Sequence, residues 1–280
     1  MTANTGALYV VATPIGNLED LSYRARRVLG EVDVIACEDT RHTRHLLTHY
    51  GITTPLVSYH EHNEVLRAAE LVQRLRRGED VALVSDAGTP AVSDPGYRLI
   101  REAGAAGLRI VPIPGPSAVM AALTASGLPP DRFVFVGFLP RKSGERRRAL
   151  EEIAAVPWTL VMYEAPHRIS AVLHDVREVF GDRQIALARE LTKKFEDVFR
   201  GRISEALTHL RIHVPRGEFT IVVEGAAKDR KEGKADAPAR MRALLAGGAA
   251  PTAAVADLVR TVGLSRREAY RLMLEIQGKR

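Results

Sequence analysis

The residues best suited to chemistry lie in the loop SDAGTPAVSDPG at 85–96, between an apolar run and a helical pattern. The backbone exposed at Gly88 can approach a small ligand. Asp86 or Asp94 can accept hydrogen bonds from an amine or from ribose hydroxyls. The competing interpretation is that these aspartates only cap the next helix or form Asx turns, which suits Asp94 better than Asp86.

Two further loops follow apolar runs and carry turn-forming residues. Pro14 fixes the turn after the run at 7–12, and Gly16 permits a positive φ or a close approach of the backbone. Ser117 and Ala118 open a helix of small residues, which leaves room for a flat ligand at the helix start. The sequence lacks the fingerprints G-x-G-x-x-G and G-K-[ST], which argues against NAD and ATP as ligands.

Composition and length describe an ordinary globular enzyme. The chain has 280 residues, 46% hydrophobic and 26% charged, which suits two packed domains better than one. Cys37 is the only cysteine, which excludes an internal disulfide framework and a paired-cysteine zinc site. No apolar run approaches the ~18 residues of a membrane span, and residues 1–6 are too short and polar for a secretory signal. We therefore expect a cytoplasmic protein that does not bind a membrane.

The formal charge of +6 is concentrated at the C-terminal end. Residues 226–280 hold twelve basic and six acidic side chains, so the first 225 residues are neutral overall. Such asymmetry is expected where one region meets a polyanion. The alternative is a solvated tail that only improves solubility.

Short apolar runs alternate with helical patterns in the first part of the chain. Strands are predicted at 7–12, 32–36, 55–59, 81–85 and 109–113, and helices at 21–29, 40–50, 64–77, 97–106 and 118–126. This alternation predicts an α/β domain with a mostly parallel sheet, helices on both faces and ligands beyond the carboxyl ends of the strands.

A second αβ unit follows the break at 127–130. Its predicted strands are 132–138, 158–163, 184–189 and 219–223, and its predicted helices are 145–155, 166–180 and 203–213. The predicted domains are thus 1–127, 128–225, a charged linker at 226–238 and a basic module at 239–280.

The C-terminal module has a clear helical pattern. Apolar residues repeat from Val255 to Val262 and again from Ala269 to Ile276. Ser265 forms an S-x-x-E capping box at the start of the second helix. This pattern resembles a helix-turn-helix, whose second helix can lie against nucleic acid. A plain helical hairpin packed on the body explains the pattern equally well.

Six motifs in this order resemble the tetrapyrrole methylase superfamily, and within it the enzymes that methylate small-subunit ribosomal RNA. The motifs are TPIGNLEDLS, CEDTRHTRHLL, SDAGTPAVSDPG, PGPSA, YEAPHR and ARELTKKFE, and the resemblance covers residues 7–225. It implies two αβ domains with the cofactor cleft between them and a small C-terminal helical hairpin. It also implies a homodimer that uses S-adenosylmethionine to methylate the ribose 2′-hydroxyl of a cytidine in the decoding region of 16S rRNA, either as free rRNA or in the small ribosomal subunit.

The resemblance also implies which residues bind the cofactor. Carried over by position, they are Pro14, Asp86, Gly88, Thr89, Ser117, Ala118, Tyr163 and Ala188. Many tetrapyrrole members have Gly-Asp-Pro in the second loop, where this chain has Ser85-Asp86-Ala87-Gly88. That departure argues against a corrin or porphyrin substrate.

Methyl transfer to a hydroxyl requires a positioned acceptor oxygen and benefits from a base or a positive environment. Two charged clusters follow strand ends, and their candidate catalytic residues are Asp39, Arg41, Glu190 and Lys193. Asp39, Glu190 or a deprotonated Lys193 would take the proton. The alternative for Asp39 is a helix N-cap.

Basic residues elsewhere are candidates for RNA phosphate contacts. They are Arg44, Arg141, Lys142, Arg146, Arg147, Arg168, Arg266, Arg267 and Arg271. A solvated helix face explains the 141–148 cluster almost as well, and Arg168 can instead pair with Glu164. His42, His45 and His49 share one helix face, but the implied reaction needs no metal and we expect none.

Two other functions stay open. A small-molecule methylase of the tetrapyrrole type would not require the basic tail. A nucleic-acid-binding regulator would bind duplex DNA without turnover.

Overall fold

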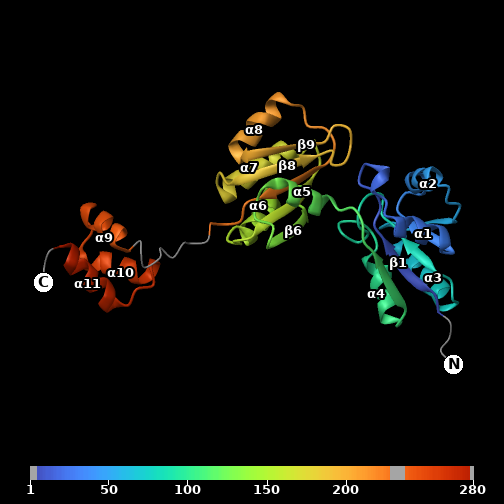
Figure 1. Ribbon diagram of the computed structural model, residues 1–280, viewed down its shortest axis with the longest axis horizontal. Coiled ribbons are helices and arrows are strands. Elements are labelled where there is room, and N and C mark those ends of the chain that lie inside the picture. Colours follow the sequence, from blue (N-terminus) through green and yellow to red (C-terminus); the bar gives the residue numbers. More distant parts are fainter. Residues whose placement is uncertain (1–4, 228–236, 278–280) are drawn as a thin grey trace. The chain divides into compact units, whose positions relative to one another are not determined.

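The computed structural model describes residues 5–227 and 237–277. The chain forms two compact units, residues 1–225 and 226–280. In Figure 1 the first unit runs from blue to orange, and the helices of the second unit are red. Most of the predicted linker at 226–238 lies outside the described residues. In the described residues no helix is long and apolar enough to cross a membrane.

The first sheet is entirely parallel, with the strand order β3-β2-β4-β1-β5. Its strands are β1 (Ala7–Val11), β2 (Val34–Cys37), β3 (Leu56–Ser58), β4 (Val81–Leu83) and β5 (Arg109–Ile113). Its helices are η1 (Leu18–Asp20), α1 (Tyr23–Glu31), α2 (Thr40–His49), α3 (Glu64–Arg76) and α4 (Tyr97–Ala105). The predicted α/β class is confirmed.

Helices cover both faces of this sheet because its strands are apolar on both sides. In β2, Val34 packs toward the cluster that holds Leu71 of α3 and Leu99 of α4. The next residue, Ile35, packs on the other face with Leu29 of α1 and Leu46 of α2. This period of two is what a strand buried on both faces requires.

The strand order explains where the first domain can bind a ligand. The chain leaves β2 toward β3 on one side, and it leaves the adjacent strand β4 toward β5 on the other side. Adjacent parallel strands whose connections diverge open a crevice beyond their carboxyl ends. The loops after β2 and β4 therefore border the site.

The second sheet is mixed, with the strand order β6-β7-β10-β8-β9, and only β6 and β7 pair in parallel. Its strands are β6 (Phe133–Phe138), β7 (Thr159–Glu164), β8 (Gln184–Arg189), β9 (Asp197–Arg202) and β10 (Phe219–Val223), and its helices are α6 (Ser143–Ile153), α7 (Ile169–Phe180) and α8 (Ile203–Ile212). The edge strand β9 was not predicted, because its sequence DVFRGR contains no apolar run.

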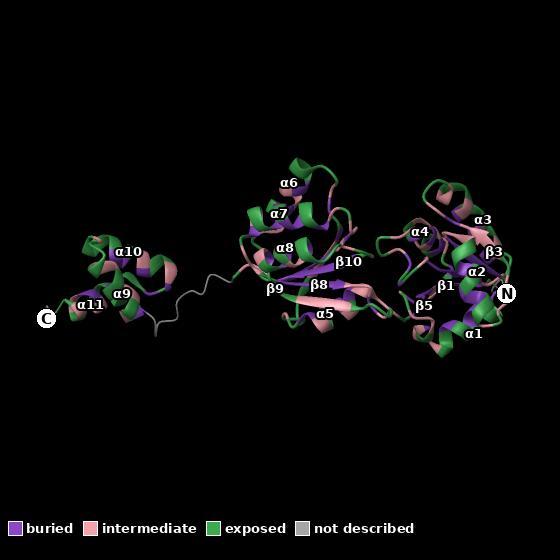
Figure 2. Cartoon of the chain, turned by 90° about the horizontal axis from the view of Figure 1, so that it is seen from above, coloured by how far each residue is buried: buried purple, intermediate pink, exposed green. Residues whose placement is uncertain are grey.

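Helix α5 (Ala118–Ser126) packs on the second sheet. Val119 and Leu123 of this helix contact the β-strand residues Val161 and Val222, while α6, α7 and α8 cover the opposite face. The central strands β7, β10 and β8 are largely buried between these layers (Figure 2), whereas the edge strands β6 and β9 are partly exposed. The domain boundary at 127 stays a prediction, but the helix before it belongs by its packing to the second sheet.

The C-terminal unit has three helices in its described part: α9 (Ala237–Ala246), α10 (Pro251–Thr261) and α11 (Arg266–Ile276). Met241, Leu258 and Met273 share one apolar core. The predicted helix pair and its capping box are present, since the Ser265 side chain accepts from the backbone N–H of Glu268 at 3.2 Å. The first helix, α9, completes the core and was not predicted.

Candidate active site

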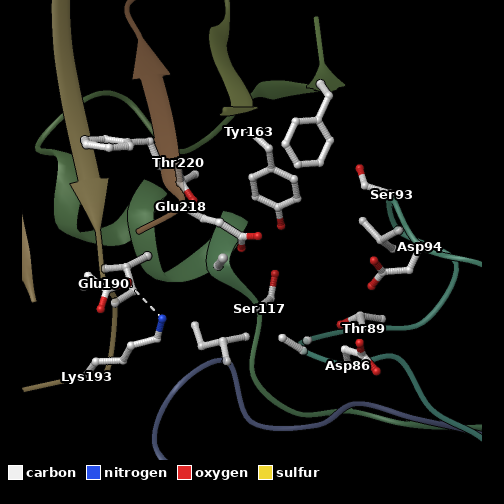
Figure 3. Close-up of a pocket in the computed structure, with 18 of the residues that line it drawn as sticks. Asp86, Thr89, Ser93, Asp94, Ser117, Tyr163, Glu190, Lys193, Glu218 and Thr220 are labelled. Atoms are coloured by element: carbon white, nitrogen blue, oxygen red, sulfur yellow. Dashed lines mark hydrogen bonds and ion pairs between the residues drawn. The ribbon is translucent and has the colours of Figure 1, made fainter. Parts of the chain in front are cut away.

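A cavity of about 350 Å³ lies at the carboxyl ends of the first sheet and is closed by residues of the second domain. The loops after strands of the first sheet contribute Ile15, Glu38, Asp86, Ala87, Gly88, Thr89, Val92, Ser93, Asp94 and Ser117, and α5 contributes Ala118. The second domain contributes Phe138, Tyr163, Glu190, Leu191, Lys193, Glu218, Phe219 and Thr220. In Figure 3 the polar groups of Asp94, Ser117, Tyr163 and Glu218 point into the same space. A volume of this size suits a small-molecule ligand.

Backbone hydrogen bonds join the loops that follow β1, β2 and β4. Thr13 and Gly88 form an isolated antiparallel bridge, with N–H···O distances of 2.9 and 3.1 Å. The backbone N–H of Asp39 donates to Asp86 Oδ1 at 3.1 Å. Gly88 has φ +87°, a conformation that favours glycine. The three loops therefore form one connected wall.

Backbone strain in the described residues is concentrated at this cavity. Four non-glycine residues of the described structure have a positive φ: Ala91, Ser93, Glu190 and Thr192. Two lie in the loop after β4 and two in the loop after β8, and both loops line the cavity. Such conformations cost free energy and persist where the surrounding fold imposes them.

Carboxylates dominate the charge of the cavity wall. Glu38, Asp86, Asp94, Glu190 and Glu218 line it, and Lys193 is the lining cation. Burial, assisted by the charges of Glu38, Asp86 and Glu218, raises the pKa of Asp94 to about 6, although a hydrogen bond with Ser85 opposes the shift. Burial and Asp86 also raise the pKa of Glu38. Crowded carboxylates of this kind favour a cationic ligand, which relieves their repulsion.

This electrostatic arrangement predicts a pH-dependent affinity for a cationic ligand. Asp94 is protonated below pH 6 and ionised above it, so affinity should fall as the pH is lowered through 6. One unit charge at a partly solvated distance changes the free energy of binding by about 1 kcal/mol, which is about fivefold. Titration calorimetry of S-adenosylmethionine at pH 5 and pH 8 measures the effect. Asp94→Asn should flatten the profile, and an unchanged profile in that variant would assign the dependence to another group.

Lys193 is held at the cavity edge by a charge and by close packing. Its Nζ lies 2.9 Å from Glu190 Oε1, the interaction drawn as a dashed line in Figure 3. A Cβ placed on Gly16 would lie 2.4 Å from Lys193 Cγ. A side chain at position 16 would therefore collide with Lys193, so Gly16 permits the close approach of the backbone that was one of its two predicted roles.

Six of the predicted cofactor residues meet at this cavity: Asp86, Gly88, Thr89, Ser117, Ala118 and Tyr163. Pro14 and Ala188 are buried behind the wall and do not line it. Ala188 packs under α5 together with Val222. Contact of these two residues with the cofactor stays a prediction.

The lining residues Glu38, Phe138, Glu218 and Thr220 were not predicted as site residues. Glu218 and Thr220 flank the start of β10, which reaches the cavity only because the second sheet places β10 beside β7 and β8. Glu38 lies next to Asp39 in the loop after β2. The expectation that ligands bind beyond the carboxyl ends of the strands therefore located this loop, but the residue chosen from it was Asp39.

Asp39 and Arg41 do not line the cavity in the described structure, so their catalytic role stays a prediction. Asp39 is the N-cap of α2 and accepts from the backbone N–H of Arg41 at 2.8 Å. Hydrogen bonds from the Arg41 side chain and backbone lower the pKa of Asp39 to about 2, which is far too low for a base at neutral pH. Arg41 and Arg44 line a separate open groove on α2 with His45.

Several of the arginines predicted to contact phosphate form ion pairs within the second domain. Arg146 is only 5% exposed, and its Nε donates to Asp175 at 2.7 Å. Arg147 pairs with the same aspartate at 2.8 Å. Arg168 lies 3.2 Å from the buried carboxylate of Glu164. These three side chains pair with carboxylates of the second domain, and their contact with RNA stays a prediction.

Other predicted cations remain on the surface. Arg141 and Lys142 are exposed, and Lys142 pairs with Glu145 at 3.3 Å. Arg266, Arg267 and Arg271 are exposed on α11. In the described residues no group of three or more His, Cys, Asp or Glu side chains is placed to hold a metal ion.

The chain combines a parallel α/β domain, a mixed second sheet and a carboxylate-rich cavity between them. The family profile for Tetrapyrrole (Corrin/Porphyrin) Methylases matches residues 7–207. The chain belongs to this family, and within it to the ribosomal RNA small subunit methyltransferase I group.

Relatives with that name extend over nearly the whole chain. The protein from Xylella fastidiosa is 49% identical over 95% of this chain and 98% of its own length. The protein from Synechocystis is 45% identical, with 98% of this chain and 99% of the relative covered. The protein from Escherichia coli O157:H7 is 46% identical over 98% of this chain and 96% of its own length.

Solved structures share the fold at low sequence identity. Diphthine synthase has a TM-score of 0.62 and 16% identity, over 79% of this chain and 90% of its own. Uroporphyrin-III C-methyltransferase from Thermus thermophilus, complexed with S-adenosyl homocysteine, has a TM-score of 0.57 and 22% identity, over 78% of this chain and 97% of its own. At these identities the likeness concerns the fold alone.

Proposed function

We propose that the protein transfers a methyl group from S-adenosylmethionine to the 2′-hydroxyl of a cytidine ribose in the decoding region of 16S rRNA. The observation that carries the proposal is the carboxylate-rich cavity, in a chain 45–49% identical to proteins named ribosomal RNA small subunit methyltransferase I. The sulfonium and amino groups of the donor are positively charged at neutral pH, so the wall has the complementary charge.

The residues of the cavity fit such a donor. Asp86 offers a carboxylate, and Gly88 leaves room for a close backbone approach, since a Cβ there would meet Ile15 only at 3.5 Å. Ser117 and Ala118 present the N-terminus of α5, and Tyr163 offers an aromatic face. When bound, S-adenosylmethionine supplies an electrophilic methyl group. The chain's own part is to bind the donor, orient it and limit access of water.

Glu190 and Lys193 are the candidates for handling the hydroxyl proton. Both line the cavity and they form an ion pair, so Glu190 Oε1 or a deprotonated Lys193 Nζ can accept a proton at the cavity edge. When Lys193 is protonated, its charge favours a developing oxyanion. Either role uses these two side chains in place of Asp39 and Arg41.

We assign the RNA contacts outside the cavity to exposed cations. They are Arg44 of α2, Arg141 and Lys142 before α6, and Arg266, Arg267 and Arg271 of α11. Contacts to phosphate depend on charge and carry no sequence information. The proposal includes a homodimer in the cytoplasm, with rRNA or the small ribosomal subunit as substrate.

The test is transfer of labelled methyl from S-adenosylmethionine to small subunits that lack the modification. The wild-type chain should place label in a ribose 2′-position. The variant Arg266→Gln, Arg267→Gln and Arg271→Gln should lower the affinity for RNA about tenfold and flatten its salt dependence, because phosphate contacts are lost. A chain ending at Gly225 should behave similarly and still bind the donor.

Two outcomes would contradict this proposal. Unlabelled RNA with intact donor binding would favour a small-molecule acceptor. Full RNA methylation by the triple variant at every salt concentration would remove α11 from the RNA contacts.

A further inference from the structure

Phe138 lies at the boundary of two cavities of different character. It lines the carboxylate-rich cavity, and it also lines an open groove of about 840 Å³. The groove is formed by Phe138, Leu139, Pro140, Arg141, Arg146, Glu164, Ala165, His167, Arg168 and Ala171. Phe138 is thus a lining residue that the groove shares with the carboxylate-rich cavity, which is called the donor cavity below because the proposed function places the methyl donor there.

The backbone of β6 directs Phe138 to this position. The pairing with β7 shifts register between Phe135 and Gly137, where a β-bulge interrupts the strand. Gly137 has φ +75°, which a residue with a side chain rarely adopts. Bulges next to active sites redirect side chains. The Phe138 ring remains 50% exposed and lies 5.5 Å from the Tyr163 ring, centroid to centroid.

The loop after Phe138 is fixed by two arginines. Arg168 donates to the carbonyls of Leu139 and Pro140 at 2.9 and 3.2 Å. Arg146 donates to the carbonyls of Pro140 and Arg141 at 3.2 and 3.0 Å. The ring is therefore exposed at the end of a rigid segment, which is the arrangement that an aromatic binding platform requires.

The charges on the two sides of Phe138 are opposite. Toward the donor cavity the ring faces a wall with several carboxylates, among them Asp94 and Glu218. In the groove, Arg168 is balanced by Glu164 and Arg146 by Asp175, and exposed Arg141 adds positive charge. A phosphodiester is repelled by the first wall and attracted by the second.

We propose that Phe138 stacks on the base of the target nucleotide, with a neighbouring phosphate at Arg141, so that the ribose reaches the mouth of the donor cavity. The inference rests on the proposed function and names how that site holds its RNA. Unstacked bases in RNA are commonly held on aromatic faces. Such stacking is tolerant of ring type but requires a flat π-face.

The experiment compares substitutions at the two ends of β6. Phe138→Ala should lower kcat/KM for unmodified small subunits by roughly 10- to 100-fold, a loss much larger than any loss of affinity for S-adenosylmethionine, whose cavity Phe138 also lines. Phe138→Tyr should restore most of the rate, and Phe138→Leu should not, because leucine fills the space without a π-face. Phe133→Ala, at the opposite end of the strand and 36% exposed in the wild type, is the matched control and should react normally.

Each alternative outcome overturns the inference. Wild-type rates in Phe138→Ala, or equal rescue by leucine and tyrosine, would exclude stacking. Loss of donor affinity equal to the loss of rate would place Phe138 only in the donor cavity. If the wild-type chain labels no RNA in the same assay, the proposed function fails and the stacking role fails with it.

Discussion

Replacing Asp86 with alanine is expected to lower kcat/KM for methyl transfer by about 100-fold. The carboxylate lines the donor cavity, and its Oδ1 accepts the backbone N–H of Asp39 at 3.1 Å. Hydrogen bonds to charged groups contribute about 1.5–3 kcal/mol, and the variant also loses one negative charge that favours a cation. A loss of about 3 kcal/mol corresponds to about 100-fold.

Two further variants separate the causes of this loss. Asp86→Asn keeps an oxygen that can accept the Asp39 N–H but removes the charge, so it should show an intermediate affinity for S-adenosylmethionine. Asp131→Ala removes an exposed aspartate outside the cavity and should leave kinetics and affinity unchanged. Titration calorimetry and initial rates provide both measurements. Normal donor affinity in Asp86→Ala would show that this carboxylate does not bind the donor.

The position of the cavity was predictable because parallel α/β sheets place their functional loops at one edge. Apolar runs located all five strands of the first sheet, and the loops after them contain Asp86, Gly88 and Ser117. Local sequence is sufficient here, since the apolar runs are distinct and the loops after β1, β4 and β5 are rich in glycine and proline. The edge strand β9 escaped prediction because its exposed face carries polar and charged side chains.

The second wall of the cavity depends on contacts between distant segments. Phe138, Glu190 and Glu218 come together because β6, β7, β10 and β8 are neighbours in one sheet. No spacing in the sequence indicates that order. The sequence therefore did not predict that the cavity is rich in carboxylates, although Asp86 and Asp94 were each identified as candidate ligand-binding residues.

The basic cluster before and within α6 shows a signal that was available in the sequence. Arg146 lies four residues before Leu150, which is buried, so both occupy the same face of the helix. Arg141 precedes the helix and stays exposed. Helical phase thus separates a structural arginine from a surface arginine, whereas a count of charges treats them alike.

The largest effect on stability is expected from Asp175→Asn. Asp175 is 3% exposed and accepts hydrogen bonds from Arg146 at 2.7 Å, from Arg147 at 2.8 Å and from Ser143 at 3.0 Å. Burial raises its pKa, but these hydrogen bonds outweigh burial and lower it. An uncharged asparagine would leave Arg146 buried without a counter-charge, which costs about 3–5 kcal/mol. For a protein of this size, Tm should fall by about 10 °C.

The pH dependence of stability gives an independent check on Asp175. Because its folded-state pKa lies below the unfolded value, its contribution is present above the unfolded pKa and is lost as the pH falls through the folded one. Acid unfolding of the wild type should therefore include a step that Asp175→Asn lacks. Chemical denaturation between pH 2 and pH 7 measures this difference.

Asp197→Asn is the matched control for the buried pair. Asp197 pairs with Arg189 at 3.0 Å, but 40% of its side chain is exposed, so water and salt compensate for the loss and the cost should stay below about 1 kcal/mol. Similar Tm values for the two variants would show that Arg146 finds another partner or water when Asp175 is lost. A larger loss for Asp175→Asn would support the role of this carboxylate as the counter-charge of Arg146, which also donates to the carbonyls of Pro140 and Arg141.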